Sequence, residues 1–250
     1  MDKKYYYNDV MVNFYDIIHT DYNVDKKFYL DKILNAKGPV LEIGCGTGRI
    51  FCDALKQGAD IYGIDQSGLM LKKLKEKIDV SEHCRVQVVD ALDYISDKKY
   101  NLIIAPFRMF MHILSIEDQI KFLKNVYESL SGDGEYVFNV FNPDLERIRT
   151  GDKECLRYEG EFMPGRIFKF YDMSKPDLLN QCQLVTFRFE WDDNGVMKED
   201  LMYFPMRYMF RFEIQHLCER AGFSSVKMYR DFDYNELNGE IKEYVVICRK

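Results

Sequence analysis

The hydrophobic positions between residues 39 and 141 follow two patterns that alternate along the chain. Short apolar runs, such as the one around Leu41, are followed by segments in which apolar residues recur every three or four positions. The runs are typical of buried strands in a parallel sheet, and the spaced segments are typical of helices that cover such a sheet. The pattern therefore predicts a doubly wound, mostly parallel α/β sheet with strands at 40–43, 61–65, 85–89, 101–105 and 136–141.

The flanking parts of the chain have different patterns. Apolar residues recur at helical spacing in 10–18 and 25–34, where Asp25 is placed to cap the second helix. Partial alternation of apolar and polar positions predicts an antiparallel β insert within 152–210, with a hairpin turn at 193–195. A helix and a closing pair of strands are expected after the insert.

Composition and charge narrow the class of protein. The net charge of −6 and the isoelectric point near 5.4 leave no basic surface for a phosphate backbone, so nucleic acid is not expected as a partner. Seven cysteines without a C-x-x-C pair suit a reducing compartment, and we expect neither disulfides nor a metal site. No apolar run approaches about 18 residues and the N-terminus lacks a signal-peptide core. These features predict a cytoplasmic protein with no membrane partner.

A glycine-rich turn follows the first predicted strand. Gly44, Gly46 and Gly48 allow the backbone to take positive φ and to approach a ligand closely, while the N–H groups of the next helical turn face that ligand. Dinucleotide-binding folds need a third glycine where this chain has Arg49, which counts against a nicotinamide-dependent oxidoreductase. A tight strand-to-helix turn without a ligand is the alternative interpretation.

The next predicted strand ends in an acid, Asp65, which lies 21 residues after Gly44. A spacing of about 20 residues brings an acidic side chain to the ribose hydroxyls in βαβ nucleotide sites. A carboxylate can accept hydrogen bonds from both hydroxyls at once. The alternative is an aspartate that caps the following helix, although Ser67 is better placed for that.

Three successive strand ends together resemble those of the class I S-adenosylmethionine (SAM) methyltransferases over residues 39–141. They carry Glu42-x-Gly-x-Gly-x-Gly, then Asp65, then Asp90. The resemblance implies a seven-stranded Rossmann-like sheet, SAM as the cofactor, and Asp90 with the next backbone amide on the adenine; a cap for the following turn is the alternative for Asp90. The positions that the resemblance implies for SAM binding are Tyr15, Glu42, Gly44, Cys45, Gly46, Gly48, Arg49, Asp65, Gln66, Asp90, Ala91, Pro106 and Arg108.

Two charged or titratable side chains follow the fourth predicted strand, where the switch point of such a sheet would face the transferred methyl. Arg108 could hold a substrate carboxylate or the SAM tail, and His112 could take a proton; the alternatives are an arginine paired with a nearby acid and a histidine bound by backbone. Tyr15, in a Tyr-Asp pair that resembles a family signature, is the third catalytic candidate, with helical packing as the alternative. Arg49 opposes the helix dipole, so we expect either an anion such as the methionine carboxylate of SAM or an exposed, screened side chain.

We expect four parts in the chain: an N-terminal helical lid (1–38), a SAM-binding core (39–151), an antiparallel insert that covers the substrate site (152–210), and a C-terminal helix and strand pair (211–250). The resemblance implies transfer of a methyl group to an amine or hydroxyl of a small-molecule acceptor by a monomer or homodimer. An RNA or protein methyltransferase and a non-catalytic SAM-binding protein are the alternatives.

Overall fold

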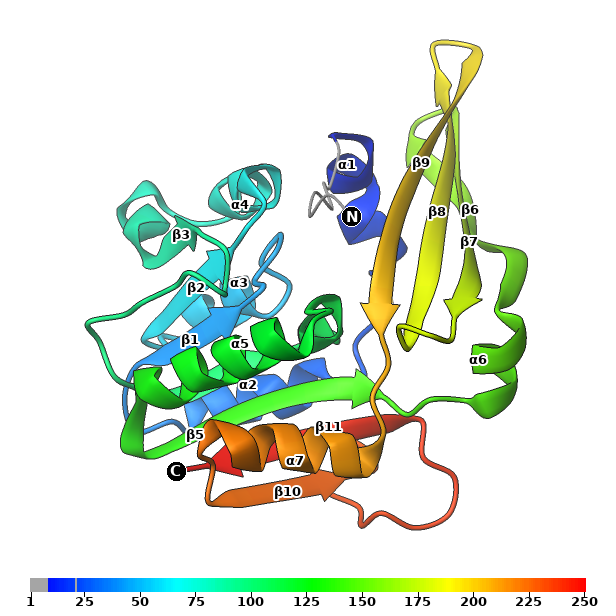
Figure 1. Cartoon of the computed structure of the whole chain (residues 1–250). Helices are drawn as coiled ribbons and strands as arrows, with labels where there is room; N and C mark the ends of the chain where they lie inside the picture. The colour runs from blue at the N-terminus through cyan, green and yellow to red at the C-terminus, as the bar shows by residue number, and fades with distance from the viewer. Residues whose placement is uncertain (1–8, 21) are drawn as a thin grey trace. The chain divides into compact units, whose positions relative to one another are not determined.

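The computed structural model describes residues 9–20 and 22–250 and divides them into two units (Figure 1). Unit 2 contains residues 23–143 and 208–250, and unit 1 contains the described residues up to 22 together with 144–207. Each unit has its own sheet and its own hydrophobic core.

Unit 2 is built on a seven-stranded sheet with the order β10-β11-β5-β4-β1-β2-β3. The pairs of β1 with β2 and β4, of β2 with β3, and of β4 with β5 are all parallel, whereas β11 runs antiparallel to both of its neighbours. The predicted doubly wound, mostly parallel sheet is therefore confirmed. The strands are β1 (Val40–Ile43), β2 (Ile61–Asp65), β3 (Val86–Val88), β4 (Tyr100–Ala105), β5 (Leu130–Phe141), β10 (Ser225–Tyr229) and β11 (Glu243–Arg249).

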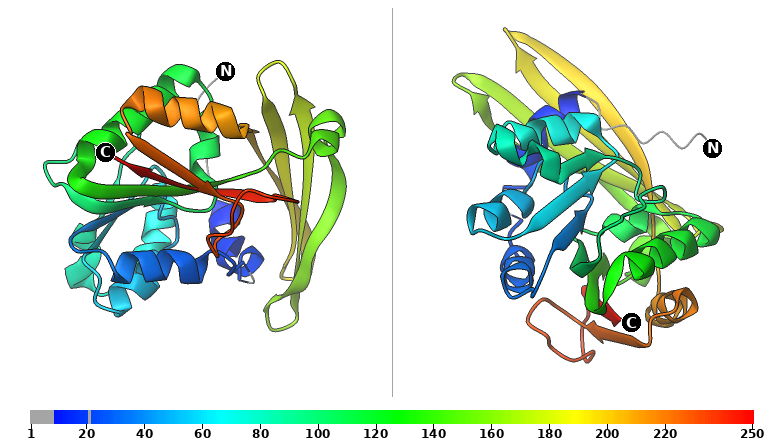
Figure 2. Two further views of the ribbon diagram at one scale, coloured as in Figure 1. Left: turned by 90° about the horizontal axis from the view of Figure 1, so that it is seen from below. Right: turned by 90° about the vertical axis from the view of Figure 1, so that its left-hand side faces the viewer.

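Helices cover both faces of this sheet because its central strands are apolar on both sides; all four residues of β1 are buried. One face shares a core with α2 (Lys26–Leu34), α3 (Phe51–Lys56) and α4 (Gly68–Lys75). The other face carries α5 (Ile116–Ser129) and α7 (Arg211–Ala221), as Figure 2 shows. Two 3-10 turns, η1 (Val80–Arg85) and η2 (Met109–His112), complete the unit. Within residues 9–20 and 22–250, no helix has the length and apolarity to cross a bilayer.

Strand β5 starts earlier than the pattern predicts, at Leu130 instead of residue 136. Two glycines at its start hide the strand in the sequence, because glycine is rare in strand interiors. The register with β4 shifts between the pairs Tyr100–Leu130 and Leu102–Glu135, and a Cβ on Gly134 would meet the Tyr100 carbonyl oxygen at 2.9 Å. Gly134 thus marks a bulge at which the two backbones approach closely.

Unit 1 contains a four-stranded antiparallel sheet, which confirms the predicted antiparallel insert. Its hairpin turn is the predicted one, with Asn194 and Gly195 both at positive φ. The apolar face packs against α1, where the ring of Phe14 stacks on that of Phe168 with centroids 3.9 Å apart. The elements are α1 (Asp9–Ile18), α6 (Leu145–Thr150), β6 (Asp152–Met163), β7 (Arg166–Asp177), β8 (Cys182–Asp193) and β9 (Val196–Arg207).

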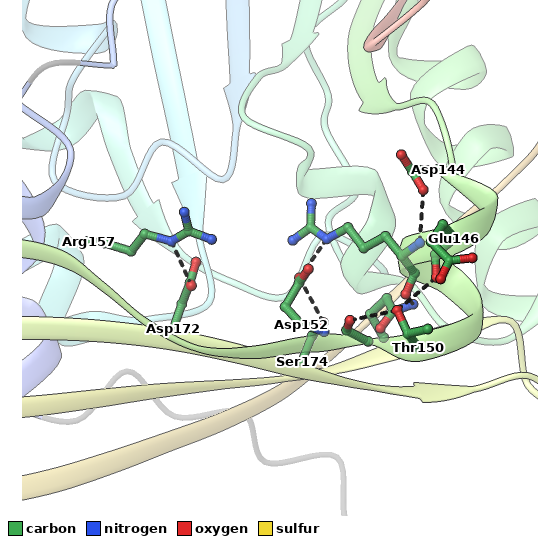
Figure 3. A network of polar contacts seen from close by, with 10 residues as sticks. Asp144, Glu146, Thr150, Asp152, Arg157, Asp172 and Ser174 are labelled. Atoms are coloured by element: carbon green, nitrogen blue, oxygen red, sulfur yellow. Dashed lines mark hydrogen bonds and ion pairs between the residues drawn. The ribbon is translucent and has the colours of Figure 1, made fainter.

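A polar network joins α6 to the start of the β6–β7 hairpin (Figure 3). Asp144 caps α6 by accepting a hydrogen bond from the backbone N–H of Arg147, and the Arg147 guanidinium pairs with Asp152 across 2.6 Å. The hydroxyl of Ser174 on β7 donates to the same Asp152 carboxylate. These bonds fix the short helix on the edge of the sheet, although the sequence pattern does not predict this helix.

Candidate cofactor and methyl-transfer site

The order of the strands reverses at β1, which lies between β2 and β4. The chain leaves β1 toward β2 and β3 on one side and later returns to β4 on the other. In open α/β sheets this switch point is where ligands bind, outside the carboxyl ends of the strands. We call the carboxyl ends of β1 to β5 the carboxyl edge. The three predicted strand ends, after β1, β2 and β3, all lie on it.

The glycine turn after β1 adopts the predicted left-handed backbone. Gly44, Gly46 and Gly48 have φ values of 74°, 56° and 88°. A Cβ on Gly48 would lie 2.5 Å from the Sγ of Cys52, so a side chain is excluded there by space as well as by φ. Cys45 is 4% exposed, and burial raises the pKa of its thiol, so only its backbone is available to a ligand.

Asp65, at the end of β2, is aligned by the turn beside it. Its Oδ2 accepts a hydrogen bond from the Gly46 N–H at 2.9 Å, and its Oδ1 accepts one from the Ser67 N–H at 2.8 Å. Burial raises the pKa of the Asp65 carboxyl, and the two N–H groups oppose that rise. Each carboxylate oxygen has about two acceptor sites, so both oxygens keep capacity for a further donor. Ser67 caps α4 by accepting from the Met70 N–H, as the sequence predicts.

Glu42 on β1 is a buried acid with an incomplete set of partners. It is 3% exposed, and its Oε2 has no hydrogen-bond partner among the described residues. Burial raises the pKa of Glu42 to about 8; Arg49 and the Phe51 N–H oppose this rise, and the Asp25 and Asp65 carboxylates add to it. Glu42 is therefore largely protonated at neutral pH.

The counter-ion of Arg49 is a carboxylate of the protein, that of Asp25. Its Nη1 and Nη2 donate to Oδ1 and Oδ2 of Asp25, both at 2.7 Å, and Asp25 is fully buried. This contact corrects the expectation that Asp25 caps the second helix: it occupies the N-cap position of α2, but its side chain makes no capping bond. Arg49 also precedes the first turn of α3, whose N-cap is Ile50. A role for Arg49 in SAM binding stays a prediction.

The turn after β4 is strained and tightly held. Phe107 and Arg108 have φ values of 54° and 64°, a region that costs a residue with a side chain about 1–2 kcal/mol. The Arg49 guanidinium lies 5.4 Å from the centroid of the Phe107 ring. Nε and Nη2 of Arg108 donate to Oε1 and Oε2 of Glu243 at 3.0 and 2.9 Å. The paired donors that would hold a substrate carboxylate are thus bound to Glu243, which favours the alternative of an arginine paired with a nearby acid.

The Arg108–Glu243 pair continues into the core. Asn139 on β5 donates to Glu243 Oε1 at 2.6 Å and accepts at 2.9 Å from the hydroxyl of Tyr29 on α2. Sequence reasoning missed Glu243 and Asn139. The sequence does contain a signal, because Asn139 and Glu243 are polar residues within or at the start of the apolar strands β5 and β11. Nothing in the sequence shows that these two residues bind each other or Arg108.

The other predicted positions differ in their surroundings. Asp90 is exposed, and its Oδ1 accepts from the Leu92 N–H at 2.9 Å, which is the turn-capping alternative. Burial lowers the pKa of His112, at the end of η2, to about 4.

Tyr15 lies on α1 in unit 1, where its ring packs edge-on against His19 with centroids 4.5 Å apart. Gln66 is exposed beside Asp65, whereas Ala91 is half-buried and Pro106 is buried. Binding and catalytic roles for all of these residues stay predictions.

The fold, the glycine turn and the acids along the carboxyl edge are those of a Rossmann-like methyltransferase, and comparison with known proteins agrees with this class. Residues 40–134 match the protein family described as Methyltransferase domain. Residues 40–134 are therefore a methyltransferase domain, in agreement with the resemblance to the class I SAM-dependent methyltransferases, whose cofactor is SAM.

Particular relatives cover parts of the chain or share its fold. Malonyl-acyl-carrier-protein O-methyltransferase 1 of Ilyobacter polytropus is 32% identical over 133 residues, which is 50% of this chain and 47% of that protein. The chain thus spans about half the length of the curated relatives it matches. The CcbJ methyltransferase of Streptomyces caelestis has a similar fold, with a TM-score of 0.74, 24% identity, and coverage of 91% of this chain and 94% of that one. The sugar N-methyltransferase KedS8 of Streptoalloteichus sp. has a TM-score of 0.76, 13% identity, and coverage of 100% and 98%.

Proposed function

We propose that the chain transfers the methyl group of SAM to an amine or hydroxyl of a small-molecule acceptor. The observation that carries this proposal is the buried Asp65 carboxylate, aligned by two backbone N–H groups beside a left-handed glycine turn at the switch point. In this assignment Asp65 accepts from the ribose hydroxyls, the glycine turn admits the methionine tail, and Asp90 with the Ala91 amide meets the adenine.

The reaction is an in-line displacement at the methyl carbon. The lone pair of the acceptor atom forms the new bond to carbon, the carbon–sulfur bond breaks with its electron pair left on sulfur, and the acceptor then loses a proton. Charge disperses as the sulfonium is consumed, so the protein contributes mainly alignment and exclusion of water.

The acceptor class rests on three further observations. A net charge of −6 does not favour a polyanionic RNA substrate. The relative that shares 32% identity is named an O-methyltransferase, and the fold also occurs in a sugar N-methyltransferase, so both oxygen and nitrogen acceptors fit. His112 favours an amine, because a histidine with a pKa near 4 is a weak base for a hydroxyl, whereas an amine bound in its neutral form needs no base for attack.

The test is calorimetric titration of SAM into the wild type and the Asp65→Asn variant. An asparagine would turn its NH₂ toward either the Gly46 or the Ser67 N–H and would offer one acceptor atom where two stood. We expect a loss of roughly 1–3 kcal/mol in binding, which is about five- to 150-fold in Kd.

The matched control is Asp60→Asn. Asp60 directly precedes β2, at the end opposite Asp65, and its half-exposed side chain pairs with Arg85. This variant should bind SAM as the wild type does. Equal affinity in all three proteins would remove Asp65 from the cofactor site. Methyl transfer from labelled SAM is then screened with panels of amines, phenols and carboxylic acids, and with bulk RNA; transfer to RNA alone would refute the small-molecule assignment.

A further inference from the structure

The last strand contributes a carboxylate to the carboxyl edge even though it is not one of the parallel strands. Because β11 runs antiparallel to β5, its first residue, Glu243, pairs with Phe141 at the carboxyl end of β5. Glu243 is 8% exposed and binds Arg108 through both of its oxygens. A bond from Asn139 fixes one of these oxygens from the core side.

Arg108 carries a positive charge close to the switch point of the sheet, where the proposed cofactor is also positively charged. It follows β4, the strand beside β1 at the switch point, and its side chain is 36% exposed. SAM carries a positive charge at the sulfonium, and in the proposed function the reacting methyl faces this segment. An arginine without a counter-ion here would repel the cofactor that the edge has to bind.

We propose that Glu243 is a positioning residue that holds Arg108 and cancels its charge, so that the turn after β4 accepts a sulfonium. The pair leaves the edge without net charge at this point. It also restrains the left-handed Phe107–Arg108 backbone from the side of β11. This inference rests on the proposed function, because neutralising the charge of Arg108 affects ligand binding only if the edge binds a cation such as SAM.

The discriminating measurement is the ratio of the affinities for SAM and for S-adenosylhomocysteine, which lacks the methyl and the positive charge. A pair that only stabilises the fold would affect both ligands equally. Glu243→Gln keeps the size of the side chain but removes its charge, and we expect it to weaken SAM binding about tenfold more than S-adenosylhomocysteine binding at low salt. The difference should shrink as salt is added, because Arg108 is partly exposed.

Two further variants make the test specific. The double variant Arg108→Gln, Glu243→Gln removes both charges and should return the affinity ratio close to the wild-type value. Glu135→Gln is the matched control, because Glu135 pairs with Arg249 on the same two strands, β5 and β11, at their opposite ends. It should leave the affinity ratio unchanged.

The outcomes separate the two proposals. A wild-type chain that binds neither ligand refutes the proposed function. A wild type that binds both, together with an unchanged affinity ratio in Glu243→Gln, refutes the role of Glu243 and leaves the function standing. A changed ratio that the double variant restores supports the role of Glu243.

Discussion

The buried carboxyl of Glu42 should make the stability of the protein depend on pH, and replacing it with glutamine should remove that dependence. The pKa of Glu42 is raised from its ordinary value of 4.5 to about 8 in the folded protein. The folded state therefore binds more protons than the unfolded state between these two values. The contribution of Glu42 to the free energy of unfolding is fully present below pH 4.5 and is lost as the pH rises toward and through 8.

The size of the effect follows from the two pKa values. A separation of 3.5 units at 1.36 kcal/mol per unit gives about 5 kcal/mol at most between the limits. Between pH 5.5 and 7.5 the same two values give about 2.5 kcal/mol. Glutamine resembles the protonated carboxyl in shape and does not titrate, so the Glu42→Gln variant should gain about 2.5 kcal/mol relative to the wild type over this range.

The assay is urea unfolding followed by far-ultraviolet circular dichroism at pH 5.5, 6.5, 7.5 and 8.5. His112 contributes the opposite trend, because burial lowers its pKa to about 4 and its contribution to stability is lost as the pH falls. The two effects partly cancel in the wild type, so the informative quantity is the difference between variant and wild type at each pH.

The control is Glu135→Gln. Burial tends to raise the pKa of Glu135, but hydrogen bonds from Lys32 and Arg249 hold this pKa below its ordinary value. The carboxyl is therefore ionised in both the folded and the unfolded state across the pH range. Its difference from the wild type should be constant from pH 5.5 to 8.5. A constant difference for Glu42→Gln as well would refute the assignment of a protonated Glu42.

Two further predictions concern the same edge. Arg49→Ala should lower the free energy of unfolding by about 3–5 kcal/mol in urea titrations, because it leaves the fully buried Asp25 carboxylate without its partner; a loss below about 1 kcal/mol would contradict this. His112→Gln should lose about 2 kcal/mol less stability than the wild type between pH 7 and pH 5, because the wild type must keep a half-buried imidazole neutral below its unfolded pKa of about 6.5. Parallel pH profiles of unfolding would show that His112 protonates freely.

Features that are local in sequence could be predicted without the structure. The strands β1, β2 and β4 are short apolar runs, and the glycines after β1 require positive φ whatever the fold around them. The sequence pattern does not predict the start of β5, because Gly132 and Gly134 are typical of the end of the preceding helix. A register shift against β4 accommodates them instead.

The partners of the charged residues could not be predicted. Arg49 and Arg108 stood out as candidates for an anionic ligand, yet both pair with a carboxylate from a distant part of the chain. Asp25 lies 24 residues before Arg49, and Glu243 lies 135 residues after Arg108. A sequence shows that such a charge needs a counter-ion, but only the packing of α2 and β11 decides whether the protein or a ligand supplies it.

The position of Glu243 on the last strand has a consequence for synthesis on the ribosome. The glycine turn, Asp65 and all the parallel strands up to β5 have been translated about a hundred residues before Glu243 is added. Arg108 therefore lacks its carboxylate until β11 is made. Under the proposed role of Glu243, the edge acquires its charge balance only when β11 pairs with β5, so the site is completed by the end of the chain that is translated last.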